Sequence, residues 1–296
     1  MAETKVDTFT SDAAKTSGKS YFLRVMLRRS VTVIGAAIIL LLIVVAIFAP
    51  LLAPYGMDQQ DLMHNLEQPS SAHWLGTDEL GRDLLSRVIY GSQISLLVGV
   101  VGVTIAGAIG MSLGLIAGFM GSWINTIIMR IIDSLMSLPP IVLMLAITSV
   151  IGGGLLNVLV ALGIGMMPTY CRLMCGQVIS VREGDFITAA RAMGAKNWRI
   201  MTRHILPNTF PPLLVLITVN LGSAIMMEAS LSFLGIGILP PTASWGAMVN
   251  NGYRFMLTNP LLSIMPGVAI LLVVLAFNMF GDGLRDALDP RLRGLI

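Results

Sequence analysis

The sequence predicts an all-α integral membrane protein with about six transmembrane helices. Of its 296 residues, 55% are hydrophobic and only 12% are charged, whereas a soluble domain of average composition has roughly 25% charged residues. Six apolar runs are long enough to cross a bilayer, since a spanning helix needs about 20 mostly apolar residues. Each run is expected to be helical, because backbone polar groups within lipid have to bond inside their own segment.

The apolar runs divide the chain into segments of different character. Residues 1–20 are polar without an apolar period, which predicts a disordered cytoplasmic tail, and 21–53 hold an N-terminal segment and the first span. Residues 54–92 form a polar, net acidic extracytoplasmic loop. The core over 93–282 carries five spans, and 283–296 form a cytoplasmic tail. The predicted spans are 31–53, 93–118, 131–150, 155–175, 209–236 and 262–281.

The basic residues set the predicted orientation. With the N-terminus in the cytoplasm, all but three of the 19 Lys and Arg residues fall on the inside, and only Arg82, Arg87 and Arg254 fall outside. The reverse orientation inverts this ratio, so both termini are expected in the cytoplasm. Basic residues scattered in short clusters between apolar runs suit membrane topology better than nucleic-acid binding.

No catalytic, metal or cofactor site is expected in this chain. Gly18-Lys19-Ser20 resembles the end of a phosphate-binding loop, but Ala13 stands where that loop needs a glycine, and no strand precedes it. If the protein works with ATP, another subunit hydrolyses it. Cys171 and Cys175 lie one helical turn apart, and two lone thiols make no closed metal site, so packing explains them better.

Small residues recur every four positions in the second span, which places them on one helix face and permits close approach of another helix. Ordinary packing within the chain explains this stripe, and so does a moving or subunit-facing helix. The residues are Gly102, Ala106, Gly110, Gly114 and Gly118.

The third span combines charges with prolines. Arg130 and Asp133 are one turn apart and can pair, which lowers the cost of an acid near the membrane. Pro139 and Pro140 remove backbone donors in the middle of the span and predict a kink. A pore-lining helix and a purely structural kink are both open.

Glu228 is the one acid far inside an apolar run. Unpaired at the bilayer centre it would cost about 2.5–3.5 kcal/mol, so it is expected to face a cavity, a partner or the outer interface. It is a candidate pathway acid or a structural one.

The inside loop over 176–208 is too long for a simple turn. Asp185 can cap a helix. An apolar stripe that includes Phe186 and Met193 follows it, Gly194 interrupts the helix, and a second amphipathic stretch ends at Pro207. Such a unit on the membrane surface suits docking of a soluble partner, the alternative being an interfacial helix without one.

This loop resembles the signature loop of binding-protein-dependent ABC importer permeases. That signature is a Glu-Ala-Ala triplet, a Gly four positions after its last Ala, and an Ile-x-Leu-Pro ending. The spacing matches, while Thr188 replaces the Glu and His204 stands at the Ile position; the first change removes one charged contact expected with the ATPase. The matching segments are Thr188-Ala189-Ala190, Gly194 and His204-Ile205-Leu206-Pro207.

Other segments resemble the second permease of the dipeptide/oligopeptide/nickel subfamily, and the likeness covers about residue 20 to the end of the chain. The segments that carry it are 75–78, 81–83, 86–87, 90–91, 228–235, 240–246 and 281–290.

The resemblance implies a type I ABC importer fold in a bacterial or archaeal cell inner membrane. Expected partners are a second homologous permease, two cytoplasmic ATPases that hold ATP and Mg²⁺, an extracytoplasmic binding protein and membrane lipid, with no nucleic acid. This chain would form half of a pathway for di- and oligopeptides, with nickel as the alternative substrate. Its ATPase-coupling residues would be Asp185, Thr188, Ala189, Ala190, Gly194, Leu206 and Pro207.

Two other classes of protein fit the residues less well. A self-contained secondary transporter needs several intramembrane acids or interrupted helices, and Glu228 alone is thin support. An intramembrane enzyme needs a nucleophile with a base, or metal ligands, at membrane depth. The histidines fall in loops or at the inside surface, at His64, His73 and His204.

Overall fold

The computed structural model describes residue 26 and residues 29–288. Within them the chain is helical apart from its loops and one isolated β-bridge between Thr77 and Asp83. The tail predicted over 1–20, with its Gly18-Lys19-Ser20 segment, lies outside the described residues. So does the end of the tail predicted over 283–296.

Five helices are long and apolar enough to cross a membrane, and a bent pair of shorter helices makes a sixth span if the two are counted together. The prediction of an all-α membrane protein with about six spans is therefore confirmed, while the placement of both termini in the cytoplasm stays a prediction. The five are α2 (Ser30–Ile47), α4 (Leu84–Met120), α7 (Leu155–Arg182), the continuous stretch Asn197–Phe233, and α12 (Leu261–Leu288).

The span predicted over 131–150 is not one helix. α5 (Ser122–Met136) and α6 (Pro140–Ile151) are bent by 88° at the break between them. Pro139 is the N-cap of α6 and Pro140 lies in its first turn. Proline is tolerated in a first turn, and it pushes the residue before it out of the helical region, so the pair separates two helices.

Several other predicted boundaries shift, among them the end predicted at residue 175, since α7 continues to Arg182. α4 begins at Leu84, inside the loop predicted over 54–92, because Asp83 caps it by accepting a hydrogen bond from the Ser86 backbone N–H. α12 continues to Leu288, beyond the span end predicted at residue 281.

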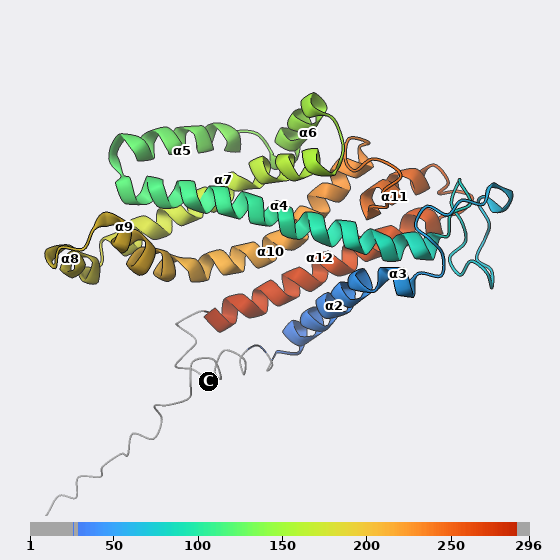
Figure 1. The fold of residues 1–296 in the computed structure, drawn as a ribbon, viewed down its shortest axis with the longest axis horizontal. Coiled ribbons are helices and arrows are strands. Elements are labelled where there is room, and N and C mark those ends of the chain that lie inside the picture. The colour runs from blue at the N-terminus through green and yellow to red at the C-terminus, as the bar shows by residue number, and fades with distance from the viewer. Residues whose placement is uncertain (1–25, 27–28, 289–296) are drawn as a thin grey trace, which may run out of the picture.

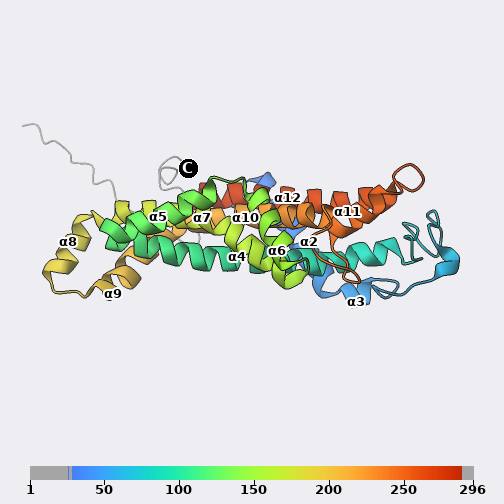
Figure 2. The same cartoon turned by 90° about the horizontal axis from the view of Figure 1, so that it is seen from above.

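The helices lie side by side in an elongated bundle, with α5 at one edge and α2 at the other (Figure 1). The short helices α8 and α9 lie at one end, and the loop before α4 lies with α11 at the opposite end (Figures 1 and 2). The remaining elements are α3 (Ala49–Leu52), η1 (Leu62–His64), α8 (Asp185–Ala192), α9 (Asn197–Ile200), the π-helical η2 (Met201–Ile205), α10 (Leu206–Phe233) and α11 (Trp245–Tyr253).

The small-residue stripe of α4 packs against α7. A Cβ at Gly110 would lie 2.5 Å from the carbonyl oxygen of Met167, and a Cβ at Gly118 would lie 2.9 Å from that of Cys175. At Gly114 a Cβ would collide with the carbonyl oxygen of Cys171. The stripe therefore serves packing within the chain, with backbone against backbone.

The two cysteines belong to this contact. Both are free and buried, and the side-chain N–H of Asn125 donates a hydrogen bond to Cys175 Sγ at 3.2 Å. In the described part of the chain no group of three or more His, Cys, Asp and Glu residues is placed to hold a metal ion. The cysteines act here as small packing residues.

Gly114→Ala is expected to lower the free energy of unfolding by about 1–3 kcal/mol, because the added methyl forces α4 and α7 apart. The matched control is Gly267→Ala in α12, where a Cβ meets nothing within 4 Å. Thermal unfolding in detergent should show a lower Tm for the first variant alone. Equal Tm values would mean that close approach of the two backbones is not needed.

Candidate functional site

The loop predicted over 176–208 is shorter in the structure, because residues 176–182 belong to α7, and the short helix α8 begins after them at Asp185. Asp185 is not the cap that the sequence predicted: Gly184 is the N-cap, and no side chain caps α8 by a hydrogen bond. The Asp185 carboxylate lies in the first turn, where its negative charge interacts favourably with the helix dipole.

α8 is attached to the membrane helices by one buried side. Ile187 is fully buried and Ala190 is 3% exposed, and the cluster around Ile187 includes Phe119 of α4 and Val178 of α7. Thr188 and Ala189 lie on the exposed side. The predicted apolar stripe is therefore divided between two faces: part of it anchors α8, and part of it faces outward.

Gly194 ends this helix and turns the chain toward α9. Its φ of +81° lies in the left-handed region, and a Cβ there would meet nothing within 4 Å. The constraint is therefore on the backbone, because a residue with a side chain rarely adopts that conformation. The Ala195 backbone N–H donates to the Ala190 carbonyl at 3.0 Å and closes the turn.

Pro207 does not end a helix, contrary to the prediction. α9, η2 and α10 form one continuous stretch over Asn197–Phe233, and Leu206 and Pro207 lie at the start of α10. Proline lacks the N–H that would bond back into the preceding turn, and the wider π-helical turn over Met201–Ile205 precedes it. The loop is thus joined to the α10 span without a break.

Arg182 joins the last turn of α7 to the last turn of α4, and the sequence reasoning did not single it out. Its Nη1 donates hydrogen bonds to the carbonyl oxygens of Gly118 at 3.0 Å and Phe119 at 3.1 Å. These carbonyls lie in the last turn of α4, where helix acceptors lack partners and a cation is favoured. The α8–α9 unit, residues 184–203, is therefore fixed to three spanning helices.

The outward surface of the α8–α9 unit is apolar and basic. Phe186 is 48% exposed, Trp198 74% and Met193 83%. Large apolar side chains with cations beside them are typical of a protein-docking surface. The exposed basic residues are Arg191, Lys196, Arg199 and Arg203.

Glu228 is completely buried in α10. The hydroxyl of Ser232 donates to Glu228 Oε1 at 2.7 Å, and the same oxygen of Ser232 accepts from the Ile238 backbone N–H at 3.0 Å. Glu228 Oε2 has no partner among the described residues. The carboxylate thus helps to hold the turn that follows α10.

Asp133 does not pair with Arg130. Its carboxylate forms an ion pair with Arg172 of α7, a contact between helices that local spacing in the sequence cannot reveal. Both side chains are about half exposed, at 54% and 51%.

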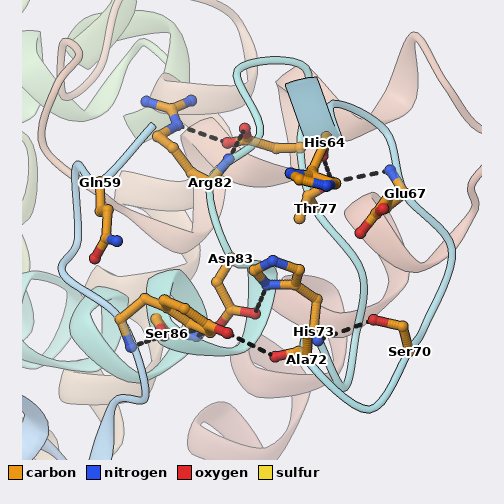
Figure 3. A network of polar contacts seen from close by, with 12 residues as sticks. Gln59, His64, Glu67, Ser70, Ala72, His73, Thr77, Arg82, Asp83 and Ser86 are labelled. Atoms are coloured by element: carbon orange, nitrogen blue, oxygen red, sulfur yellow. Dashed lines mark hydrogen bonds and ion pairs between the residues drawn. The ribbon is translucent and has the colours of Figure 1, made fainter. Parts of the chain in front are cut away.

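A polar network holds the loop over residues 53–83 against the start of α4, at the opposite end of the bundle from α8 and α9 (Figure 3). His73 Nδ1 lies 3.0 Å from Asp83 Oδ1, and Ser86 Oγ donates to Asp83 Oδ2 at 2.7 Å. A nucleophile and its base need a hydrogen bond to each other, but here both groups contact the carboxylate, so the arrangement is structural. Asp78 Oδ2 accepts from Arg82 Nε at 2.7 Å and lies 3.5 Å from Arg87 Nε.

Two family models match this chain. Residues 110–294 match the binding-protein-dependent transport system inner membrane component, and residues 20–69 match the N-terminal transmembrane domain of oligopeptide transport permease C.

Similar proteins are transport permeases. The chain is 46% identical over 263 residues to a probable D,D-dipeptide transport system permease of Escherichia coli, covering 89% of this chain and 88% of that protein. It is 44% identical to a dipeptide transport permease of Alkalihalophilus pseudofirmus, covering 90% and 88% of the two chains. It is 45% identical to a glutathione transport permease of Pectobacterium atrosepticum, covering 92% and 91%.

The solved structure of the inward-facing MetNI methionine ABC transporter contains a chain of similar fold. Its TM-score is 0.57 at 21% sequence identity, with coverage of 69% of this chain and 97% of that one. At this identity the likeness concerns the fold alone.

Ser232→Ala is expected to lower the free energy of unfolding by about 1–3 kcal/mol, because it leaves Glu228 and the Ile238 N–H buried without their partner. Ser230→Ala is the matched control, since that hydroxyl bonds only to the Met226 carbonyl of its own helix. Denaturation in detergent should separate the two variants. If both were equally stable, the buried hydroxyl would not be the support of this turn.

Proposed function

This chain belongs to the family of binding-protein-dependent transport system inner membrane components, and from that premise we propose that it forms half of a translocation pathway for di- and oligopeptides. It is a multi-pass inner-membrane permease subunit with the fold of an ABC importer. The proposed substrate class rests on the similar proteins, which include two dipeptide permeases and a glutathione permease. Glutathione is itself a peptide, so one chemistry is common to all three.

A permease of this family works with an ATPase and a substrate-binding protein. The finer composition is part of the proposal: a second, unlike permease, two cytoplasmic ATPases and one extracytoplasmic binding protein. ATP and Mg²⁺ would be held in the ATPases, and this chain would need no cofactor of its own. Both of its termini would lie in the cytoplasm.

The α8–α9 unit would be the coupling element. The observation that carries this role is its outward surface, where Phe186, Met193 and Trp198 are exposed beside basic side chains. The buried Ile187 attaches the unit to the spanning helices. A soluble protein that buries these apolar groups gains their transfer free energy, of the order of 1.5–3 kcal/mol for each large side chain fully buried.

Movement of the ATPases would reach the pathway through rigid contacts. Arg182 bonds to the end of α4, Ile187 packs into the hydrophobic cluster formed by α4 and α7, and α9 continues into α10 without a break. When the ATPases close on ATP, displacement of the α8–α9 unit would therefore shift spanning helices together. Thr188, which stands where the family has Glu, would make this contact without one charge.

Phe186→Asp is expected to leave the chain folded but to reduce ATPase retention during purification, and ATP-driven uptake, by at least tenfold, because it places a charge at an apolar contact. Leu257→Asp is the control: Leu257 is fully exposed in the loop that follows α11, and α11 lies at the opposite end of the bundle. That variant should retain the ATPase. Undiminished retention in Phe186→Asp would remove the coupling role from this surface.

Uptake by membrane vesicles tests the substrate class. Vesicles that hold the assembled transporter and its binding protein should accumulate labelled dipeptide with ATP. Accumulation of Ni²⁺ without dipeptide would favour the nickel alternative and would contradict the peptide proposal.

A further inference from the structure

The two edges of the helix bundle expose different chemistry. On α2, at one edge, every exposed side chain from Val31 to Ile47 is apolar, as expected of a helix that faces lipid. On α5, at the other edge, polar and charged side chains are exposed alongside apolar ones such as Trp123 and Met136. Both edges belong to apolar spans of one chain, so the difference indicates different surroundings.

Five exposed polar residues of α5 and its C-cap form one face. Successive members are three or four positions apart, which aligns them along one side of a helix. Ile132, on another side, is buried against the bundle, while Ile127 and Ile131 are exposed along the border of the polar face. We call the following set the α5 polar face: Ser122, Thr126, Arg130, Asp133 and Ser137.

The Asp133–Arg172 ion pair extends this face onto α7. Thr169 and Gly176, one turn to either side of Arg172, are also exposed. Asp133 lies about 16 Å from the inner end of α5 at the α-helical rise per residue. Charged groups that face hydrocarbon cost up to about 2.5–3.5 kcal/mol each, so this edge is a poor lipid surface.

A tightly packed interface with another protein explains the α5 polar face no better than a lipid surface does. Arg130 has no ion-pair partner among the described residues, and the other two charges are half exposed. Burying these charges dry against a second permease would carry a desolvation cost of several kcal/mol per ion. A water-filled path leaves them hydrated.

We propose that the α5 polar face lines the inner half of the substrate path and that Asp133 and Arg172 bind the two charged ends of a peptide in transit. This inference rests on the proposed peptide function. A dipeptide at neutral pH carries one ammonium and one carboxylate, which an extended dipeptide places about 7 Å apart. The ammonium replaces Arg172 as the partner of Asp133, and the carboxylate replaces Asp133 as the partner of Arg172.

This exchange of partners suits a site that has to release its ligand. Each residue is paired both before and after binding, so no charge is left without a counter-ion at either stage. The arginine side chain has several rotatable bonds and a planar fork that matches a carboxylate, which allows the exchange without movement of the helices.

Thiol labelling tests the location of the α5 polar face. Buried Cys171 and Cys175 are replaced by alanine, and single cysteines are introduced as Thr126→Cys, Ser137→Cys and, on the lipid-facing edge, Leu40→Cys. A membrane-impermeant reagent is added to inside-out vesicles that hold the assembled transporter. We expect Thr126→Cys and Ser137→Cys to label at least tenfold faster than Leu40→Cys. Equal rates would overturn the assignment.

Substrate protection tests the binding role in the same vesicles. Dipeptide supplied with binding protein and ATP should slow labelling of Ser137→Cys several-fold. Asp133→Asn and Arg172→Gln should each abolish this protection, whereas Ser134→Ala, also exposed on α5, should keep it. Protection that survives both neutralised charges would overturn the proposed contacts.

The two tests separate the two claims. Fast labelling in a transporter that does not import dipeptide would place the face in water but would reject both the peptide proposal and the peptide-end contacts. Dipeptide uptake with labelling as slow as at Leu40→Cys would support the peptide function and reject this path.

Discussion

Close approach of the α4 and α7 backbones is the contact on which the rest of this structure depends. α4 has 37 residues and is about 55 Å long at the α-helical rise, and three glycines along it leave room for carbonyl oxygens of α7. In lipid the hydrophobic effect does not drive helices together, so association relies on close van der Waals packing of this kind. Near the first turn of α4, Trp245 Nε1 of α11 donates to the Val88 carbonyl at 2.9 Å, and Arg182 of α7 bonds to the last turn of α4. Both ends of α4 are therefore held by neighbouring helices.

The hydrophobic cluster around Ile187 extends that rigid pair to the α8–α9 unit. Phe119, Val178 and Ile187 come from α4, α7 and α8, so the helix that would meet the ATPase rests on this closely packed pair. Because α9 also continues into α10, a push on the exposed face has no soft hinge in which to dissipate. The two edges of the bundle differ in the polarity of their exposed side chains, with apolar α2 at one edge and the α5 polar face at the other.

The sequence predicted what depends on composition and short spacing. The apolar runs identified most spans, the glycine period identified the packing face of α4, and the spacing around Gly194 identified the inside loop. It failed where the deciding contact is distant: Asp133 was expected to pair with Arg130 on its own helix, and its partner lies on α7. Pro207 was taken for a helix end because proline usually interrupts a helix. The π-helical turn before it, which lets α9 continue into α10, could not be seen in the residue pattern. Nor could local spacing show that Arg182 bonds to α4, or that Glu228 is covered on all sides.

The most direct test of the central claim, that the α8–α9 unit docks a cytoplasmic ATPase, is site-specific photo-crosslinking in native membranes. A photoreactive amino acid in place of Ala189, which is exposed on α8, samples whatever covers that surface. Mass spectrometry of the adducts should identify a P-loop ATPase subunit as the crosslinked protein. Adducts with lipid alone, in membranes where the other subunits are shown to be present, would contradict the account.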